Sequence, residues 1–253
     1  MKSIPRFVLN YTVYAFLFFA VLVIGGKYAL DYTGAAYSDY DNAAQTIKSE
    51  RTPLIMIDPG HGGEDGGAVE DGVLEKDLNL AISARLSGLY ELFGIPYEST
   101  RTEDKMLYDK YADSSDYRGH KKTYDLRARL QTAEESGAAI YVGIHMNRFP
   151  KPQYKGLQVY YSPNTEESGK AAAVMQSYAK RYLDPSNERE TKKATQAIYI
   201  LKRIKIPAIL IECGFLSNAE ERAKLCTPEY QRELSAAIFA STVEYLCAEK
   251  AAG

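Results

Sequence analysis

The chain has 253 residues, of which 45% are hydrophobic and 25% are charged, enough for one folded domain with a sizeable core. The formal net charge of -2 excludes the broad basic surface that nucleic-acid binding requires. The cysteines, Cys213, Cys226 and Cys247, are too few and odd in number to suggest a disulfide framework.

The first 26 residues predict a helix that anchors the chain in a membrane. Lys2 and Arg6 precede an apolar stretch from Phe7 to Gly26, and about 20 apolar residues suffice to span a bilayer as a helix. The apolar part of a cleaved signal peptide is usually shorter, about 7–15 residues, so we expect a retained anchor with its N-terminus in the cytoplasm. The small residues 34–36 leave a cleaved signal as the alternative. In both cases the rest of the chain is expected outside the cytoplasmic membrane.

Short apolar runs predict five strands of a sheet that is covered on both faces. These runs are Leu54–Asp58, Ile95–Ser99, Ile140–His145, Gly156–Tyr161 and Ala208–Cys213. Apolar residues at three- and four-residue steps predict helices over residues 75–94, 125–136, 166–183 and 228–249. Asn218 with Glu221 indicates a capping box at the start of another helix. The alternation indicates a single α/β domain with a mostly parallel sheet flanked by helices on both faces.

Histidine and glutamate side chains occur at the ends of three expected strands. His61 follows the first strand, His145 ends the third, and Glu212 lies near the end of the last. Ligands of open α/β sheets bind outside the carboxyl ends of the strands. A hydrolytic zinc ion usually takes three nitrogen or oxygen ligands and leaves one position for water. We therefore expect His61, His145 and Glu75, which begins a helix after a Gly-rich loop, to be ligands. Glu212, the remaining acid, is expected to transfer protons.

Other interpretations of the Gly-rich loop stay open. Four further acids lie in the same loop and compete with Glu75 as ligands: Glu64, Asp65, Glu70 and Asp71. Glu75 could serve only to favour a helix N-terminus. The glycines at 60, 62 and 63 could instead bind a phosphate, although no nucleotide-binding fingerprint follows them.

Two reactive residue types outside the loop are assigned lesser roles. His120 lies in a polar segment and is expected to be exposed. Cys213 adjoins Glu212 and could be offered as a nucleophile, but no third histidine is placed to activate it. We expect it to be a small buried residue.

Taken together, these segments resemble the zinc-dependent N-acetylmuramoyl-L-alanine amidases of the Amidase_3 family. The resemblance covers about residues 52–247 and implies an α/β fold around a twisted sheet, Zn2+ on His61, Glu75 and His145, and a catalytic glutamate at Glu212. The choice of Glu75 over Glu64 leans on this resemblance. The segments that carry it are Ile57–Gly63, Leu74–Asp77, Thr100–Asp104, Leu126–Arg129, Ile144–Asn147, Gly156–Tyr161 and Ile211–Asn218.

A closer resemblance, carried by the stretch from Tyr117 to Arg129, is to the spore-cortex amidases. It implies removal of the stem peptide from muramic acid in peptidoglycan, after which a polysaccharide deacetylase forms the muramic-δ-lactam that germination requires. In this interpretation residues 1–26 are a signal-anchor helix, residues 27–51 a linker and residues 52–250 the zinc amidase domain. The enzyme would act from the membrane in the space between forespore and cortex.

Two rival functions remain. One is a zinc peptidase that cuts within the stem peptide, and the other is a non-catalytic regulator of wall enzymes. No expected ligand is missing, and Glu212 is present, which favours an enzyme. Asn147 and Arg101 are expected to lie near the substrate groove, Arg101 mainly in a packing role.

Overall fold

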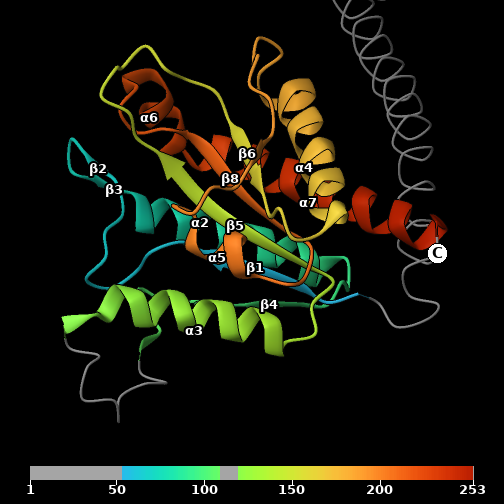
Figure 1. Ribbon diagram of the computed structural model, residues 1–253. Coiled ribbons are helices and arrows are strands. Elements are labelled where there is room, and N and C mark those ends of the chain that lie inside the picture. The colour runs from blue at the N-terminus through green and yellow to red at the C-terminus, as the bar shows by residue number, and fades with distance from the viewer. Residues whose placement is uncertain (1–52, 109–118, 253) are drawn as a thin grey trace, which may run out of the picture. The chain divides into compact units, whose positions relative to one another are not determined.

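Figure 1 shows the computed structural model of the chain, which describes residues 53–108 and 119–252. All of these residues belong to one compact unit. Six strands form one sheet in the order β4-β1-β5-β8-β6-β7, and two more form a separate hairpin. The sheet strands are β1 (Ile55–Pro59), β4 (Tyr97–Ser99), β5 (Ile140–Asn147), β6 (Gln158–Tyr161), β7 (Lys192–Lys193) and β8 (Ala208–Phe215). The hairpin consists of β2 (Val69–Glu70) and β3 (Val73–Leu74).

The sheet is mostly parallel, as the sequence predicts. Strands β4, β1, β5 and β8 run in one direction, β6 pairs antiparallel with β8, and β7 pairs parallel with β6. Because parallel neighbours end at the same edge of a sheet, the carboxyl ends of β1, β5 and β8 lie next to one another.

Helices cover both faces of this sheet (Figure 1). Their bounds are α2 (Glu75–Leu92), α3 (Lys121–Glu135), α4 (Glu166–Tyr178), α5 (Tyr199–Arg203), α6 (Ala219–Leu225) and α7 (Pro228–Ala252). Met56 of β1 packs in one cluster with Ala133 of α3 and Leu201 of α5. The next residue, Ile57, is equally buried and points to the other face. That face is covered by α2, α4 and α7, with α7 in contact with both of the others.

The helix that begins at Glu75 illustrates how the sequence produces these elements. Leu78, Ile82 and Leu86 recur every fourth residue and are buried, so one stripe of α2 packs into the core. The helix ends before Gly94, whose φ of 65° is the left-handed conformation that commonly terminates helices. This fixes Glu75 in the first turn, at the edge where the parallel strands end.

The predicted elements are found with changed boundaries. The helix expected at 125 begins earlier, at Lys121, and the helix expected over 166–183 is α-helical only to Tyr178 and ends in a π-helical turn, Ala179–Leu183. Asn218 caps α6 by accepting from the Glu221 backbone N–H at 3.0 Å. The Glu221 carboxylate instead accepts from the backbone N–H groups of Phe215 and Gly156, so only half of the expected capping box forms.

The predicted membrane anchor over residues 1–26 and the linker over residues 27–51 lie outside the described residues, as do Tyr117 and Arg118. Within residues 53–108 and 119–252 no helix combines the length and apolar character needed to cross a bilayer. The expectation of an anchor therefore stays a prediction.

Candidate metal centre

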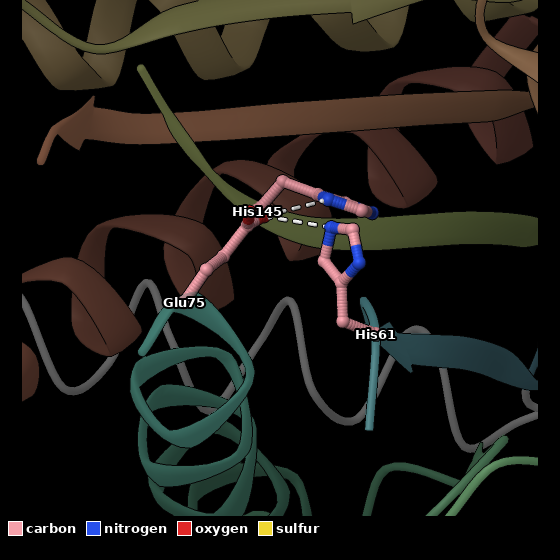
Figure 2. Close-up of side chains that lie close together, drawn as sticks. All are labelled: His61, Glu75 and His145. Carbon is pink, nitrogen blue, oxygen red and sulfur yellow. Dashed lines mark hydrogen bonds and ion pairs between the residues drawn. The ribbon is translucent and has the colours of Figure 1, made fainter. Parts of the chain in front are cut away.

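Three of the residues singled out in the sequence meet at the carboxyl edge of the sheet. His61 follows β1, His145 lies near the end of β5, and Glu75 begins α2. One ligand atom of each lies within 4.8 Å of the others. Oε1 of Glu75 is 3.2 Å from Nε2 of His61 and 3.0 Å from Nδ1 of His145. Figure 2 shows both imidazole rings turned toward this carboxylate.

Glycines make this close approach possible. The Gly60 backbone N–H donates to the Ile144 carbonyl at 3.0 Å, which ties the loop after β1 to β5. A Cβ at Gly60 would lie 2.2 Å from Cε1 of His145, so only glycine leaves room for that ring. Gly67, at φ +70°, is equally restricted, because a Cβ there would lie 2.5 Å from Oε2 of Glu75. His61 itself adopts φ 62°, a conformation that the surrounding contacts must hold.

The Glu75 carboxylate is buried and held by the backbone. Its Oε2 accepts from the Ala68 N–H at 2.7 Å and its Oε1 from the Met146 N–H at 3.0 Å. Burial opposes its charge, but hydrogen bonds from His145 and His61 hold the pKa of Glu75 well below its usual range. The group is therefore an anion at neutral pH, pre-positioned between two imidazoles.

Asp65 fixes the orientation of His61. Its Oδ2 lies 2.9 Å from Nδ1 of His61, and the hydrogen bond holds the pKa of Asp65 below its usual range. Although burial disfavours the imidazolium, Asp65 and Glu75 raise the pKa of His61 to about 9. An imidazole whose second nitrogen is bonded to a carboxylate is the usual arrangement around a protein-bound metal ion. From the sequence, Asp65 was a competing ligand candidate. In the structure it forms a hydrogen bond with the ring nitrogen of His61 that points away from Glu75.

Two buried arginines hold the loop that carries His61. Arg129 of α3 donates to the carbonyls of Pro59 and His61, and Arg101 donates to those of Pro59 and Gly60. These two side chains are 1% and 2% exposed, respectively. A buried guanidinium is costly unless its donors are satisfied, so these bonds make the loop conformation and the arginines interdependent.

The charge of Arg129 is balanced within the same network. It pairs with the buried carboxylates of Asp58 and Asp125 at 2.5 and 2.8 Å. Asp58 also accepts hydrogen bonds from Thr100 and Tyr141. Burial would raise the pKa of Asp58, but Arg129 and the two hydroxyl groups hold it below its usual range. The packing role expected for Arg101 is thus shared with Arg129, whose role the sequence did not indicate.

Glu212 lies beside the cluster on β8. Its Cα is the pairing partner of the Cα of His145 on β5. Within the described residues, its Oε2 is buried and has no hydrogen-bond partner. Burial raises the pKa of Glu212 to about 7; the Glu75 charge adds to this rise, and His145 and His61 oppose it. An unpartnered buried carboxylate is costly in a folded protein, a feature that is typical of functional sites.

The other candidates are occupied elsewhere. Glu64, Glu70 and Asp71 pair with Lys121, Arg148 and Arg222 at the surface. His120 is exposed, as expected. Cys213 is buried, and burial raises the pKa of its thiol, so it remains protonated and is no nucleophile.

The Gly-rich loop is not arranged to hold a phosphate. The backbone N–H of Gly63 donates to Asp104 at 2.7 Å and that of Gly67 to Asp65 at 3.2 Å. The Ala68 N–H donates to Glu75. Donors that a phosphate would need are thus used by carboxylates, which also repel an anion.

The donor set fits a catalytic zinc ion. Two imidazoles and one carboxylate are a known ligand set for hydrolytic zinc, with a fourth position left for water. The observed separation of the three donors brings them close enough to share one small cation. The second nitrogen of His61 is already engaged by Asp65, which leaves Nε2 toward the shared position.

Comparison with known proteins agrees with this arrangement. Residues 55–243 match the family described as N-acetylmuramoyl-L-alanine amidase (Amidase_3). The germination-specific N-acetylmuramoyl-L-alanine amidase of Bacillus subtilis is 33% identical over 192 residues, which cover 76% of this chain and 79% of that protein. All four site residues lie inside the matched range.

Solved structures show the same fold. The CwlD amidase from Clostridioides difficile, determined in complex with the GerS lipoprotein, is 36% identical with a TM-score of 0.72 over 78% of this chain and 99% of that one. The amidase AmiC2 of Nostoc punctiforme is 31% identical with a TM-score of 0.63 over 77% of this chain and 97% of that one. On the strength of the family match and the B. subtilis relative, the chain belongs to the N-acetylmuramoyl-L-alanine amidase (Amidase_3) family.

Proposed function

We propose that this protein hydrolyses the amide bond between N-acetylmuramic acid and L-alanine in peptidoglycan, with Zn2+ held by His61, Glu75 and His145. The observation that carries this proposal is the convergence of the three donors within 4.8 Å beside Glu212. The family match over residues 55–243 supplies the substrate class.

The ligand residues have distinct tasks in this proposal. A bound zinc ion supplies a Lewis acid that polarises the scissile carbonyl and lowers the pKa of water. Glu75 contributes the negative charge that a dication requires, and the backbone donors at Ala68 and Met146 keep its carboxylate in place. Asp65 holds Nδ1 of His61, so that Nε2 presents its lone pair.

Glu212 is the proposed general base and acid. Its carboxylate takes a proton from the attacking water and returns it to the departing amine of L-alanine. Burial raises the pKa of Glu212, and a carboxylate with a raised pKa is a better proton acceptor than an ordinary one. Its unpartnered oxygen is free to accept that proton.

The test is mass spectrometry of purified peptidoglycan digested by the protein with added zinc, with and without a chelator. We expect intact stem peptides with a free L-alanine amino terminus, only when metal is present. Shortened stem peptides, with the remainder still on muramic acid, would replace this function with that of a stem peptidase. An absence of any product from sacculi and from cortex would favour the non-catalytic regulator.

We further propose that the substrate is spore-cortex peptidoglycan, because a similar protein is a germination-specific amidase. The enzyme would act outside the cytoplasmic membrane, anchored by residues 7–26, and a polysaccharide deacetylase would convert its product to muramic-δ-lactam. Deleting the gene in its host should remove this lactam from the cortex, as measured by muropeptide chromatography. Cortex with normal lactam would contradict the assignment.

A further inference from the structure

Arg189 is linked through one side chain, Gln158, to the strand pair that carries Glu212. Gln158 of β6 is the Cα partner of Glu212 on β8 in an antiparallel pair, so their side chains share one face and their Cα atoms are about 5 Å apart. Oε1 of Gln158 accepts from Nη1 of Arg189 at 2.9 Å, while its Nε2 donates to the Glu190 carbonyl at 2.8 Å. The guanidinium is thus hydrogen-bonded to the side chain of Gln158, the residue that lies opposite Glu212 in the sheet.

The Arg189 guanidinium is held rigidly. Its Nε donates to the Lys155 carbonyl at 2.7 Å, and its central carbon lies 4.5 Å from the centre of the Phe215 ring. Stacking on an aromatic face and two fixed hydrogen bonds leave the plane of the guanidinium little freedom. Its position is therefore set before any ligand arrives.

The charge of Arg189 is not neutralised by an ion pair with any residue in the described ranges. Glu221, an acid within its electrostatic reach, uses both carboxylate oxygens to accept from the backbone N–H groups of Phe215 and Gly156. Arg129, by contrast, is paired with two carboxylates. A rigid guanidinium that is not paired with a carboxylate of the protein is available to bind an anion.

There is room for a ligand beside this charge. Arg189 lines an open cavity of about 310 Å³ together with Lys155 and Asn187, and with two acids, Asp184 and Glu188. Among protein side chains, the planar fork of an arginine is the best suited to a carboxylate, which it binds through two parallel hydrogen bonds. Nη2 of Arg189 donates to no acceptor among the described residues and remains available for such a bond.

We propose that Arg189 binds a carboxylate of the stem peptide, on the leaving-group side of the scissile amide. This inference rests on the proposed function, because that function makes a peptide starting with L-alanine the leaving group. A carboxylate on the residue after L-alanine lies about two residues, or roughly 7 Å, from the scissile bond. Arg189 is a substrate-binding residue in this account, and it takes no part in proton transfer.

The test compares two soluble muropeptides that differ only at the residue after L-alanine, whose carboxylate is free in one and converted to an amide in the other. We expect the wild-type protein to favour the free carboxylate in kcat/KM by about tenfold to a hundredfold, the range of one charge-assisted hydrogen-bonded pair. Arg189→Gln should reduce this ratio to about one, mainly through KM. Arg189→Lys, which keeps the charge but not the fork, should give an intermediate ratio.

Arg181→Gln is the matched control, since Arg181 also stacks on an aromatic ring, 5.3 Å from the centre of Tyr182, but is exposed and does not line the cavity beside Arg189. It should retain the wild-type ratio. If Arg189 only supports Phe215, Arg189→Gln will slow both substrates equally and leave the ratio unchanged, which overturns the inference. A wild-type ratio near one also overturns it. If neither muropeptide nor sacculi release a peptide with an L-alanine amino terminus, the proposed function itself is refuted.

Discussion

Glu75 touches both histidines of the cluster through one oxygen atom, and this sets the chemistry of the metal-free site. Its Oε1 lies 3.2 Å from His61 and 3.0 Å from His145. Two neighbouring carboxylates, Glu75 and Asp65, raise the pKa of His61 to about 9, so its imidazole is protonated at neutral pH when no metal is bound. The positive charge of protonated His61 partly balances the negative charges of Glu75 and Asp65, as a bound dication would.

Zinc binding should therefore be pH-dependent over an unusual range. Metal must displace the His61 proton at every pH below about 9, so the apparent affinity should rise about tenfold per pH unit up to that value. An ordinary histidine, with a pKa near 6.5, would give a plateau above neutral pH. Competition titrations against a chelator between pH 6 and 9 measure this, and a plateau above pH 7 would contradict it. By the same competition, activity at a limiting zinc concentration should fall as the pH is lowered below about 9.

Asp65 should matter for metal affinity although it is not an expected ligand. Asp65→Asn removes the charged acceptor of the Nδ1 hydrogen bond of His61, and loss of such a partner usually costs about 10–100-fold in metal affinity or activity. Glu64→Gln is the control, because Glu64 lies in the same loop but pairs with Lys121 at the surface. Equal zinc dissociation constants for the two variants would show that Asp65 does not orient His61.

At the scale of elements, the sequence indicated the strands and the helix start but not the contacts that join them. The positions of His61, Glu75, His145 and Glu212 follow from short apolar runs and one helical period, which are local signals. The bond from Arg129 to the His61 carbonyl joins residues 68 positions apart. No local pattern reports such a contact, so the role of Arg129 became visible only in the structure.

The elements that sequence reasoning missed are short. The hairpin strands β2 and β3 and the edge strand β7 have two residues each, and α5 has five. Such lengths are too small to show a hydrophobic period, and their positions depend on tertiary contacts. The antiparallel direction of β6 also has a physical reason. The segment between β5 and β6 contains no helix. Two parallel strands need a longer crossover connection, usually a helix, so β6 runs opposite to β5 and β8.

The close packing between the loop after β1 and strand β5 leads to a prediction at this scale. Gly60→Ala would place a methyl group 2.2 Å from Cε1 of His145, so the ring must move and zinc affinity should fall by about tenfold or more. Gly88→Ala is the matched control in α2, where a Cβ meets nothing within 4 Å. The control should bind zinc normally and gain up to about 1 kcal/mol in the free energy of unfolding. Normal zinc binding by Gly60→Ala would contradict the packing described.

At the scale of the whole molecule, the parallel sheet is what assembles the site. His61 and Glu212, which are 151 positions apart in the sequence, are brought to one edge because β1, β5 and β8 are adjacent and end together. The sequence could predict that the site lies beyond the carboxyl ends of the strands, because sheets of this kind bind ligands there. It did not predict that β1, β5 and β8 are neighbours in that order. The pairing of His145 with Glu212, which gives the acid its place beside the ligands, depends on strand register. Register is fixed by packing on both faces of the sheet rather than by either strand alone.

The most direct test of the account is the turnover of Glu212→Gln at full zinc occupancy, measured on muropeptides with bound zinc quantified in the same sample. The substitution keeps the size of the side chain but removes the proton acceptor, so we predict wild-type zinc content and a loss of turnover of about 100-fold to 10,000-fold. Loss of zinc together with activity would make Glu212 a ligand instead of the proton-transfer residue. Turnover close to that of the wild type, with zinc bound, would contradict the mechanism.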